Sequence, residues 1–352
     1  MYKVRHIRES EGEAKLIIIM ERGAPRENID LVIEKVRERG FSPHPIFGVE
    51  RTVIGVIGDN TRESIPYFQQ LPLVESVVPV LKPYKLASRE AHAGTSQIKV
   101  GKAVVGGQAL AVAAGPCAVE DKEQLLTTAK FVSECGAVML RGGAYKPRTE
   151  AYAFQGLGKK GLELLAEARE QTGLAVVTEV VDTRAVKEVA KYADMLQIGA
   201  RSMQNFALLR EAGASGHPVL LKRGLASTVD EWLSAAEYIL AEGNSQVVLC
   251  ERGIRTFETA TRFTLDLSSV PVVQHYSHLP ILVDPSHAAG NWRLVRALSL
   301  AAVAAGADGL LVETHPDPSR ALVDGAQALD FDNFKRLMAA VRKVAKAIGR
   351  TL

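Results

Sequence analysis

Residues 137–149 read AVMLRGGAYKPRT, and this stretch decides the fold. An apolar run, 137–140, is followed directly by Arg141, two glycines and then Lys146-Pro147-Arg148-Thr149. A short apolar run that ends in charged residues is typical of a parallel strand buried on both faces. The three cations repel one another unless an anion lies among them, and their head groups suit phosphate or carboxylate. A solvated basic loop is the alternative interpretation. We therefore predict a buried strand whose carboxyl end binds an anion.

The same arrangement recurs along the chain, always with an apolar run that ends in polar or charged residues. The runs cover 110–117, 137–141, 175–179, 195–201, 218–223, 246–252, 280–287 and 309–315. Amphipathic helical patterns lie between them, most clearly at 122–135, 162–171, 229–241, 292–305 and 334–348. Strand–helix units of this number over roughly 250 residues predict a (β/α)8 TIM barrel. A doubly wound open sheet is disfavoured, because no dinucleotide fingerprint follows the first strand.

In such a barrel the carboxyl ends of the strands converge on one site. The polar residues expected to meet there are Cys117, Arg141, Lys146, Glu179, Arg201, Lys222, Arg223, Arg252, Asp284, His287, Glu313 and His315.

The first ninety or so residues do not continue this pattern. They predict a strand at 15–20, a helix at 25–39, strands at 41–49 and 51–58, a helix at 61–70 and a strand at 74–81. This order is that of a ferredoxin-like βαββαβ domain. We expect this domain at 1–85, a linker at 86–97 and the barrel at 98–352. Residues 98–105 and those from 108 onward are expected to form a hairpin around Gly106-Gly107 that plugs the barrel floor.

Composition places the chain among ordinary globular proteins, with 47% hydrophobic and 24% charged residues. The net charge of +3 is too small to indicate a nucleic-acid partner. No stretch is long and apolar enough to predict a membrane span, and no signal-peptide pattern begins the sequence. The three cysteines indicate a reducing compartment and no disulfide framework, so we expect a cytoplasmic protein.

A thiol, an imidazole and two carboxylates form a candidate metal site. Cys117 closes the first barrel strand, His287 the seventh, Glu313 belongs to the eighth, and Asp324 follows in the next loop. This donor set suits a divalent transition metal such as Mn²⁺, Fe²⁺, Co²⁺ or Zn²⁺. Taken singly, Cys117 fits a buried small hydrophobe and Asp324 a turn residue.

Several segments together carry a resemblance to a known family. They are GPC at 115–117, LRGGAYKPRT at 140–149, QIGAR at 197–201, LLKRG at 220–224, CERG at 250–253, DPSH at 284–287 and VETHPDP at 312–318. The chain resembles the 3-deoxy-D-arabino-heptulosonate 7-phosphate (DAHP) synthases of the type Iβ branch, which carry an N-terminal ferredoxin-like regulatory domain. The resemblance covers the whole barrel and extends into the first domain through ERTVIG at 50–55.

The resemblance implies condensation of phosphoenolpyruvate with erythrose 4-phosphate, the first step of the shikimate pathway. The implied metal ligands are Cys117, His287, Glu313 and Asp324, and the implied proton donor is Lys146. Phosphoenolpyruvate would be held by Arg141, Lys146, Arg201, Lys222, Arg252 and His287. Erythrose 4-phosphate would be held by Lys146, Pro147, Arg148 and Thr149, with Asp284 and Ser286 near its hydroxyls. The first domain would bind tyrosine or phenylalanine, with His44 as a possible contact, and the chain would form a homotetramer.

Three other functions are open. An octulosonate phosphate synthase would use arabinose 5-phosphate on the same barrel, but it typically has an Ala-Asn step where this chain has Pro147. A Schiff-base aldolase would need a lysine with a lowered pKa, and Lys222 is its candidate. A binding protein on an inactive barrel would not need the intact donor set.

Glu179 could orient Lys146 or a water, and His315 could support a ligand. Structural or surface roles are expected for Cys135, Cys250, His217, His275 and His278.

Overall fold

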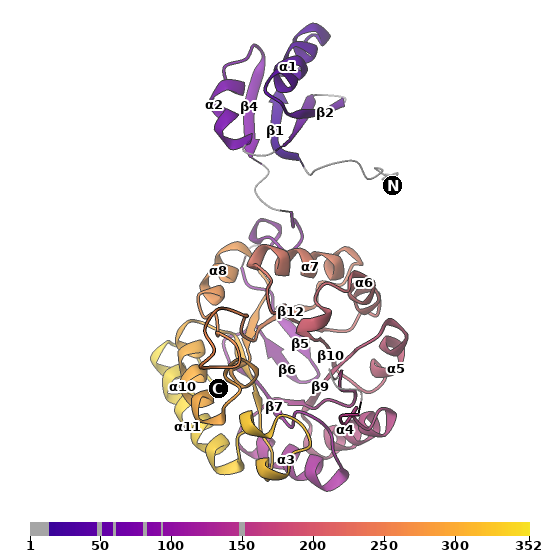
Figure 1. The fold of residues 1–352 in the computed structure, drawn as a ribbon, viewed down its shortest axis with the longest axis vertical. Helices are drawn as coiled ribbons and strands as arrows, with labels where there is room; N and C mark the ends of the chain where they lie inside the picture. Colours follow the sequence, from indigo (N-terminus) through magenta and orange to yellow (C-terminus); the bar gives the residue numbers. More distant parts are fainter. Residues whose placement is uncertain (1–13, 48–50, 59–60, 80–82, 93, 148–151) are drawn as a thin grey trace. The chain divides into compact units, whose positions relative to one another are not determined.

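The structure, a computed structural model, describes residues 14–47, 51–58, 61–79, 83–92, 94–147 and 152–352. The chain divides into two compact units, 1–83 and 84–352. Figure 1 shows both units, and each is described by itself. Within the described residues, no helix is long and apolar enough to cross a membrane.

The first unit is a four-stranded antiparallel sheet with helices. Its elements are β1 (Ala14–Met20), α1 (Arg26–Glu38), β2 (Ser42–Phe47), β3 (Thr52–Ile57), η1 (Thr61–Ser64), α2 (Ile65–Phe68) and β4 (Val74–Pro79). The strand order is β2-β3-β1-β4. Alternate residues of β1, such as Leu16 and Ile18, form a core with Val32 of α1 and Phe68 of α2. The predicted ferredoxin-like domain is therefore confirmed. His44 is exposed on the edge strand β2, opposite Gly55 of β3.

The second expected helix, 61–70, is split in the structure. It forms a 3₁₀ turn, η1, followed by the four-residue α2. Pro66 lies in the first turn of α2. Because proline lacks a backbone N–H, it is tolerated at a helix start and not in a helix interior, so the longer helix is interrupted there.

The second unit is a closed barrel of eight parallel strands in sequence order, surrounded by helices (Figure 1). The strands are β7 (Ala111–Gly115), β8 (Met139–Arg141), β9 (Ala175–Glu179), β10 (Met195–Ile198), β11 (Val219–Lys222), β12 (Val247–Glu251), β13 (Ile281–Val283) and β14 (Gly309–Glu313). The main outer helices are α3 (Lys122–Glu134), α4 (Lys159–Thr172), α5 (Val186–Val189), α6 (Phe206–Ala214), α7 (Val229–Ala241), α8 (Ser269–Tyr276), α10 (Trp292–Ala304) and α11 (Phe331–Ala347). The predicted TIM barrel is confirmed.

A hairpin closes the amino-terminal end of the barrel, but its turn differs from the prediction. Strands β5 (Ile98–Val100) and β6 (Ala103–Val105) pair with each other and pack on residues from the barrel interior such as Met139 and Val177. The turn is made by Gly101, whose φ is +56°, and Lys102, and not by Gly106-Gly107. Glycine at 101 supplies the left-handed conformation that a two-residue hairpin turn requires.

The expected linker, 86–97, belongs to the barrel unit in its described part. The backbone N–H groups of Lys85, Leu86 and Ala87 all donate to the carboxylate of Glu237 in α7, at 2.9–3.0 Å. The His278 ring contacts Leu86 O at 2.7 Å and Ser96 Oγ at 2.8 Å. These polar contacts fix the segment on the barrel, which composition alone does not indicate.

Candidate active site and metal centre

The ends of β7 and β8 approach each other closely, and a glycine allows this. Gly115, at the end of β7, has a φ of +152°, and a Cβ atom there would lie 2.2 Å from the carbonyl oxygen of Arg141. Only glycine permits such contact. Two residues further on, Cys117 O accepts a hydrogen bond from Gly143 N–H at 3.2 Å. Cys117 is thereby placed beside the glycine loop that follows β8.

Asp284 orients His287. Asp284 directly follows β13 and caps the short helix α9 (Pro285–Ala289). Its carboxylate accepts a hydrogen bond from the His287 backbone N–H at 2.9 Å. Its other oxygen lies 2.7 Å from His287 Nδ1 and 2.6 Å from Lys222 Nζ. The opposite ring nitrogen, Nε2, lies 3.3 Å from Glu313 Oε1. A carboxylate behind an imidazole is the usual way of fixing a metal-ligating histidine.

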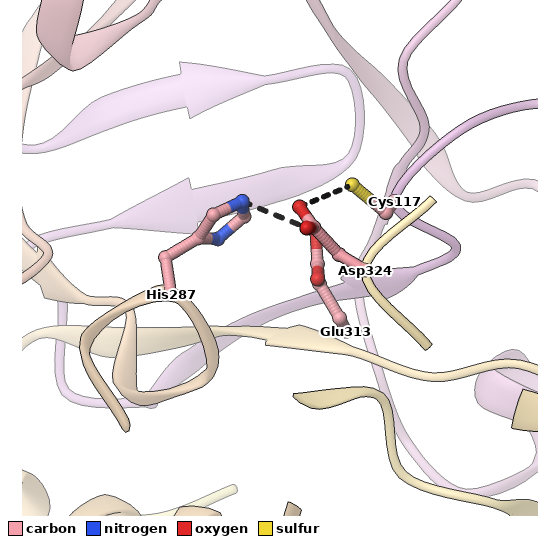
Figure 2. Close-up of side chains that lie close together, drawn as sticks. All are labelled: Cys117, His287, Glu313 and Asp324. Carbon is pink, nitrogen blue, oxygen red and sulfur yellow. Dashed lines mark hydrogen bonds and ion pairs between the residues drawn. The ribbon is translucent and has the colours of Figure 1, made fainter. Parts of the chain in front are cut away.

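Four donor groups meet at the end of the barrel (Figure 2). One donor atom from each of Cys117, His287, Glu313 and Asp324 lies within 4.8 Å of the others. Cys117 Sγ is 3.3 Å from Asp324 Oδ2. Asp324 has a φ of 55°, a left-handed conformation that is uncommon for a residue other than glycine and that often marks a functional site. The mixture of thiol, imidazole and carboxylate fits a divalent transition metal.

Burial and neighbouring charges shape the ionisation of this cluster. Burial, with a contribution from Glu313, raises the pKa of the Cys117 thiol to about 12. Burial would also raise the pKa of Glu313, but His287, Arg141 and Lys146 hold it at about 2. For His287, burial lowers the pKa although Asp284 and Glu313 oppose the shift. Glu313 is thus held in its ionised form and His287 is biased towards the neutral imidazole, whereas a bound cation would favour loss of the Cys117 proton.

A cationic pocket of about 290 Å³ lies at the same end of the barrel. Its charged lining consists of Arg141, Lys146, Arg201, Lys222, Arg252, Arg262, Glu179 and Asp324, and His287 also faces it. Lys146 Nζ lies 3.1 Å from both the carbonyl oxygen and the Sγ of Cys117. The pocket therefore adjoins the donor cluster, and the excess of cations over carboxylates suits a ligand with several negative charges.

The structure separates the predicted site residues into four groups. All six expected phosphoenolpyruvate contacts line the pocket, together with Pro147. Asp284 and Ser286, expected near the sugar hydroxyls, are fully buried and do not line the pocket, and Ser286 Oγ accepts from Glu313 N–H at 3.0 Å. Arg148 and Thr149 lie outside the described residues. Arg223 does not line the pocket and forms ion pairs with Glu251 and Asp266 at 3.0 and 2.7 Å.

Other residues considered from the sequence have structural surroundings. His315 is buried, with Nε2 3.4 Å from Glu120 Oε2 and Nδ1 accepting from Asp317 N–H. Cys250 is enclosed in the barrel interior, and Cys135 is half-buried at the end of α3. Of the two roles expected for His278, the structure supports the structural one, since this residue is buried and its ring contacts the segment before β5. Glu179 lines the pocket, and its carboxylate accepts from Gln197 Nε2 at 3.3 Å.

Several residues that line the pocket were not predicted as site residues from the sequence, among them Gln197, Leu225, Arg262 and Phe263. Gln197 lies within β10, and its inward position follows only from the barrel register. Arg262 and Phe263 lie in the long loop after β12, where no periodicity shows which side chains turn inward. Arg262 Nη1 is 3.0 Å from Gln327 Oε1 and 3.4 Å from Asp324 Oδ1.

Fold and site together define the class, a TIM-barrel protein with a cationic pocket beside a candidate metal centre. The chain belongs to the DAHP synthetase I family, whose family model matches residues 89–350. A second family model, described as DAHP synthase ferredoxin-like domain, matches residues 16–82.

Named relatives agree with this assignment. The phospho-2-dehydro-3-deoxyheptonate aldolase of Thermotoga maritima is 52% identical over 95% of this chain and 99% of its own length. A crystal structure of that aldolase, also called DAHP synthase, superimposes with a TM-score of 0.78 over 96% of this chain and 98% of the other. A 2-dehydro-3-deoxyphosphooctonate aldolase of Syntrophotalea carbinolica is 34% identical over 68% of this chain and 93% of its own length.

Proposed function

We propose that this protein is a metal-dependent DAHP synthase, which condenses phosphoenolpyruvate with erythrose 4-phosphate and releases phosphate. The observation that carries the proposal is the cationic pocket directly beside the cluster of Cys117, His287, Glu313 and Asp324. Both proposed substrates are phosphorylated, and phosphoenolpyruvate also carries a carboxylate. The 52% identity to the Thermotoga maritima aldolase over nearly the whole chain supports the same substrates.

In this proposal the pocket cations divide between two substrates. Arg141, Lys146, Arg201, Lys222 and Arg252 hold the phosphate and carboxylate of phosphoenolpyruvate. Lys146 and Pro147 line the pocket and lead into Arg148 and Thr149, which take erythrose 4-phosphate. Pairing each anion with guanidinium and ammonium groups fixes both the position and the charge of the reacting molecules.

The proposed reaction forms one carbon–carbon bond. Carbon 3 of phosphoenolpyruvate attacks the aldehyde carbon, water adds at carbon 2, and phosphate leaves by C–O cleavage. The aldehyde oxygen gains a proton from the Lys146 ammonium, which the Cys117 carbonyl positions at 3.1 Å. Cys117, His287, Glu313 and Asp324 would hold a divalent ion, which would supply Lewis-acid chemistry at the aldehyde.

We also propose the regulatory and cellular setting. The first domain binds tyrosine or phenylalanine and inhibits the barrel, with His44 as a contact, and the protein assembles as a homotetramer. All three cysteines are free in the structure, in keeping with a reducing cytoplasm. The reaction would then stand at the entry to aromatic amino acid biosynthesis through the shikimate pathway.

The alternative function is octulosonate phosphate synthesis from arabinose 5-phosphate, which the name of the Syntrophotalea carbinolica relative suggests. The test supplies phosphoenolpyruvate with either erythrose 4-phosphate or arabinose 5-phosphate and measures phosphate release and product mass. We expect kcat/KM to be at least about tenfold higher with erythrose 4-phosphate. A preference for arabinose 5-phosphate would assign the alternative, and turnover with neither sugar would favour a binding protein. Trapping of a substrate adduct by borohydride would instead indicate a Schiff base on Lys222.

A further inference from the structure

Arg252 is a buried pocket cation that forms no ion pair with a carboxylate among the described residues. Arg141 is paired with Glu313, Lys222 with Asp284, and Arg262 with Asp324. Lys146 and Arg201 contact backbone carbonyls. Arg252 is only 6% exposed, and within the described part of the chain its Nη1 has no hydrogen-bond partner. A buried donor without a partner is costly, so this guanidinium is suited to a ligand that supplies the missing acceptor.

An aromatic ring takes the place of the missing acid. The guanidinium carbon of Arg252 lies 4.2 Å from the centroid of the Phe263 ring, within cation–π range. Both residues line the pocket. The face of an aromatic ring attracts the guanidinium but does not use up the N–H donors that lie in the guanidinium plane. A carboxylate would accept hydrogen bonds from those donors and so occupy them.

Backbone hydrogen bonds hold the segment around Phe263. Phe263 N–H donates to Ala288 O at 2.9 Å, and Thr264 and Ile254 exchange two hydrogen bonds at 2.9 and 3.0 Å. Gly253, with a φ of +89°, allows this close packing, because a Cβ atom there would lie 2.7 Å from Phe263 Cβ. The loop after β12 therefore places Phe263 beside Arg252, the residue that directly follows this strand.

We propose that Phe263 is a positioning residue for anion binding, holding Arg252 through a cation–π contact so that its N–H donors stay free for the substrate. The proposal rests on the proposed function only for the identity of the anion, phosphoenolpyruvate. Phe263 acts on Arg252 and not on the reacting atoms. Its loss should therefore weaken binding of one substrate without slowing the chemical step.

The test compares three variants of the full-length protein by calorimetric titration with phosphoenolpyruvate and with inorganic phosphate. Phe263→Leu removes the ring, Phe263→Tyr retains it, and Phe257→Leu makes the same change at a fully solvent-exposed position of the same loop. We expect Phe263→Leu to raise the Kd for phosphoenolpyruvate roughly tenfold. Phe263→Tyr should restore most of the affinity, and Phe257→Leu should bind as the wild type does.

Steady-state kinetics distinguish positioning from general loss of structure. Phe263→Leu should raise the KM for phosphoenolpyruvate and change the KM for erythrose 4-phosphate and kcat by no more than about twofold. An unchanged Kd, or an equal rise in both KM values with a lowered melting temperature, would overturn the proposal. If the wild type binds phosphoenolpyruvate but turns over no sugar phosphate, the proposed function fails while the Kd values still decide the role of Phe263.

Discussion

At the scale of single residues, the pocket combines cations that differ in how their charge is offset. The buried pairs Arg141–Glu313 and Lys222–Asp284 measure 2.5 and 2.6 Å, and both acids also contact His287. These cations therefore serve the donor cluster as well as the pocket. Arg252 forms no ion pair with a carboxylate among the described residues, and its charge is available to a ligand. Burial lowers its pKa, which is the expected cost of a desolvated guanidinium without a counter-ion.

The first prediction separates the two substrate sites by substitution. Arg252→Ala should raise the KM for phosphoenolpyruvate about 10- to 100-fold, because a charge-assisted hydrogen bond is lost. Arg148→Ala should do the same for erythrose 4-phosphate. Initial rates with each substrate varied in turn measure both constants, and each variant serves as the control for the other. Equal changes in both KM values in both variants would show that the pocket is not divided in this way.

At the scale of elements, a buried ion network connects β11, β12 and the loop after β12. Arg223 Nη1 contacts Glu251 and Asp266, and Arg223 Nε donates to Ser227 O at 2.9 Å. Glu251 also accepts from Gly253 N–H at 2.7 Å and lies within 3.4 Å of Ser269 Oγ. This network holds both ends of the loop that carries Arg262 and Phe263.

The second prediction concerns the stability of this network. Arg223→Met leaves two carboxylates without their cation and should lower the free energy of unfolding by about 3–5 kcal/mol. Arg184→Met removes an exposed pair with Asp182 and should leave the free energy of unfolding nearly unchanged, because solvent screens the two charges. Urea unfolding followed by tryptophan fluorescence compares them, and buried Trp232 lies 5.9 Å from the Arg223 guanidinium. Equal destabilisation in the two variants would contradict the assigned importance of the network.

Much of the barrel could be predicted from sequence because buried parallel strands are continuous apolar runs. The strand 175–179 and the helix 229–241 have the predicted ends. Other strands end earlier than predicted, as β13 does at Val283, because Asp284 begins a helix as its cap. The charged residues at the strand ends could be predicted as well, because each of them marks the point where an apolar run stops. Phe263 was not, since its position depends on a close approach at Gly253 that no sequence period encodes.

At the scale of the whole molecule, the chain joins two units with separate cores. The barrel contains the complete donor cluster and the pocket. The barrel unit begins at Tyr84, which is 1% exposed, and its next three residues bind Glu237. A deletion that tests the first domain should therefore end at residue 83 and not at 85.

The third prediction assigns feedback inhibition to the first domain. The intact protein should be inhibited by tyrosine or phenylalanine at millimolar concentration. In this proposal the protein has an active and an inactive arrangement of its domains, and the effector binds the inactive one more tightly. Deletion of 1–83 should leave turnover intact and abolish inhibition. Deletion of 1–87 provides the control, since it removes the contacts to Glu237 and should lower the melting temperature of the barrel. An intact protein that neither amino acid inhibits would leave assembly as the role of this domain.

Turnover of phosphoenolpyruvate and erythrose 4-phosphate by metal-stripped protein, with its metal content determined, tests whether the reaction depends on a metal ion at the donor cluster. Removal of metal by EDTA should abolish activity, and Mn²⁺ or Co²⁺ should restore it in the wild type. Cys117→Ala should recover less than about 1% of the wild-type rate under the same conditions, because a ligand of the ion is missing. Full activity in protein shown to be free of metal, or full recovery in Cys117→Ala, would contradict a metal-dependent reaction at this cluster.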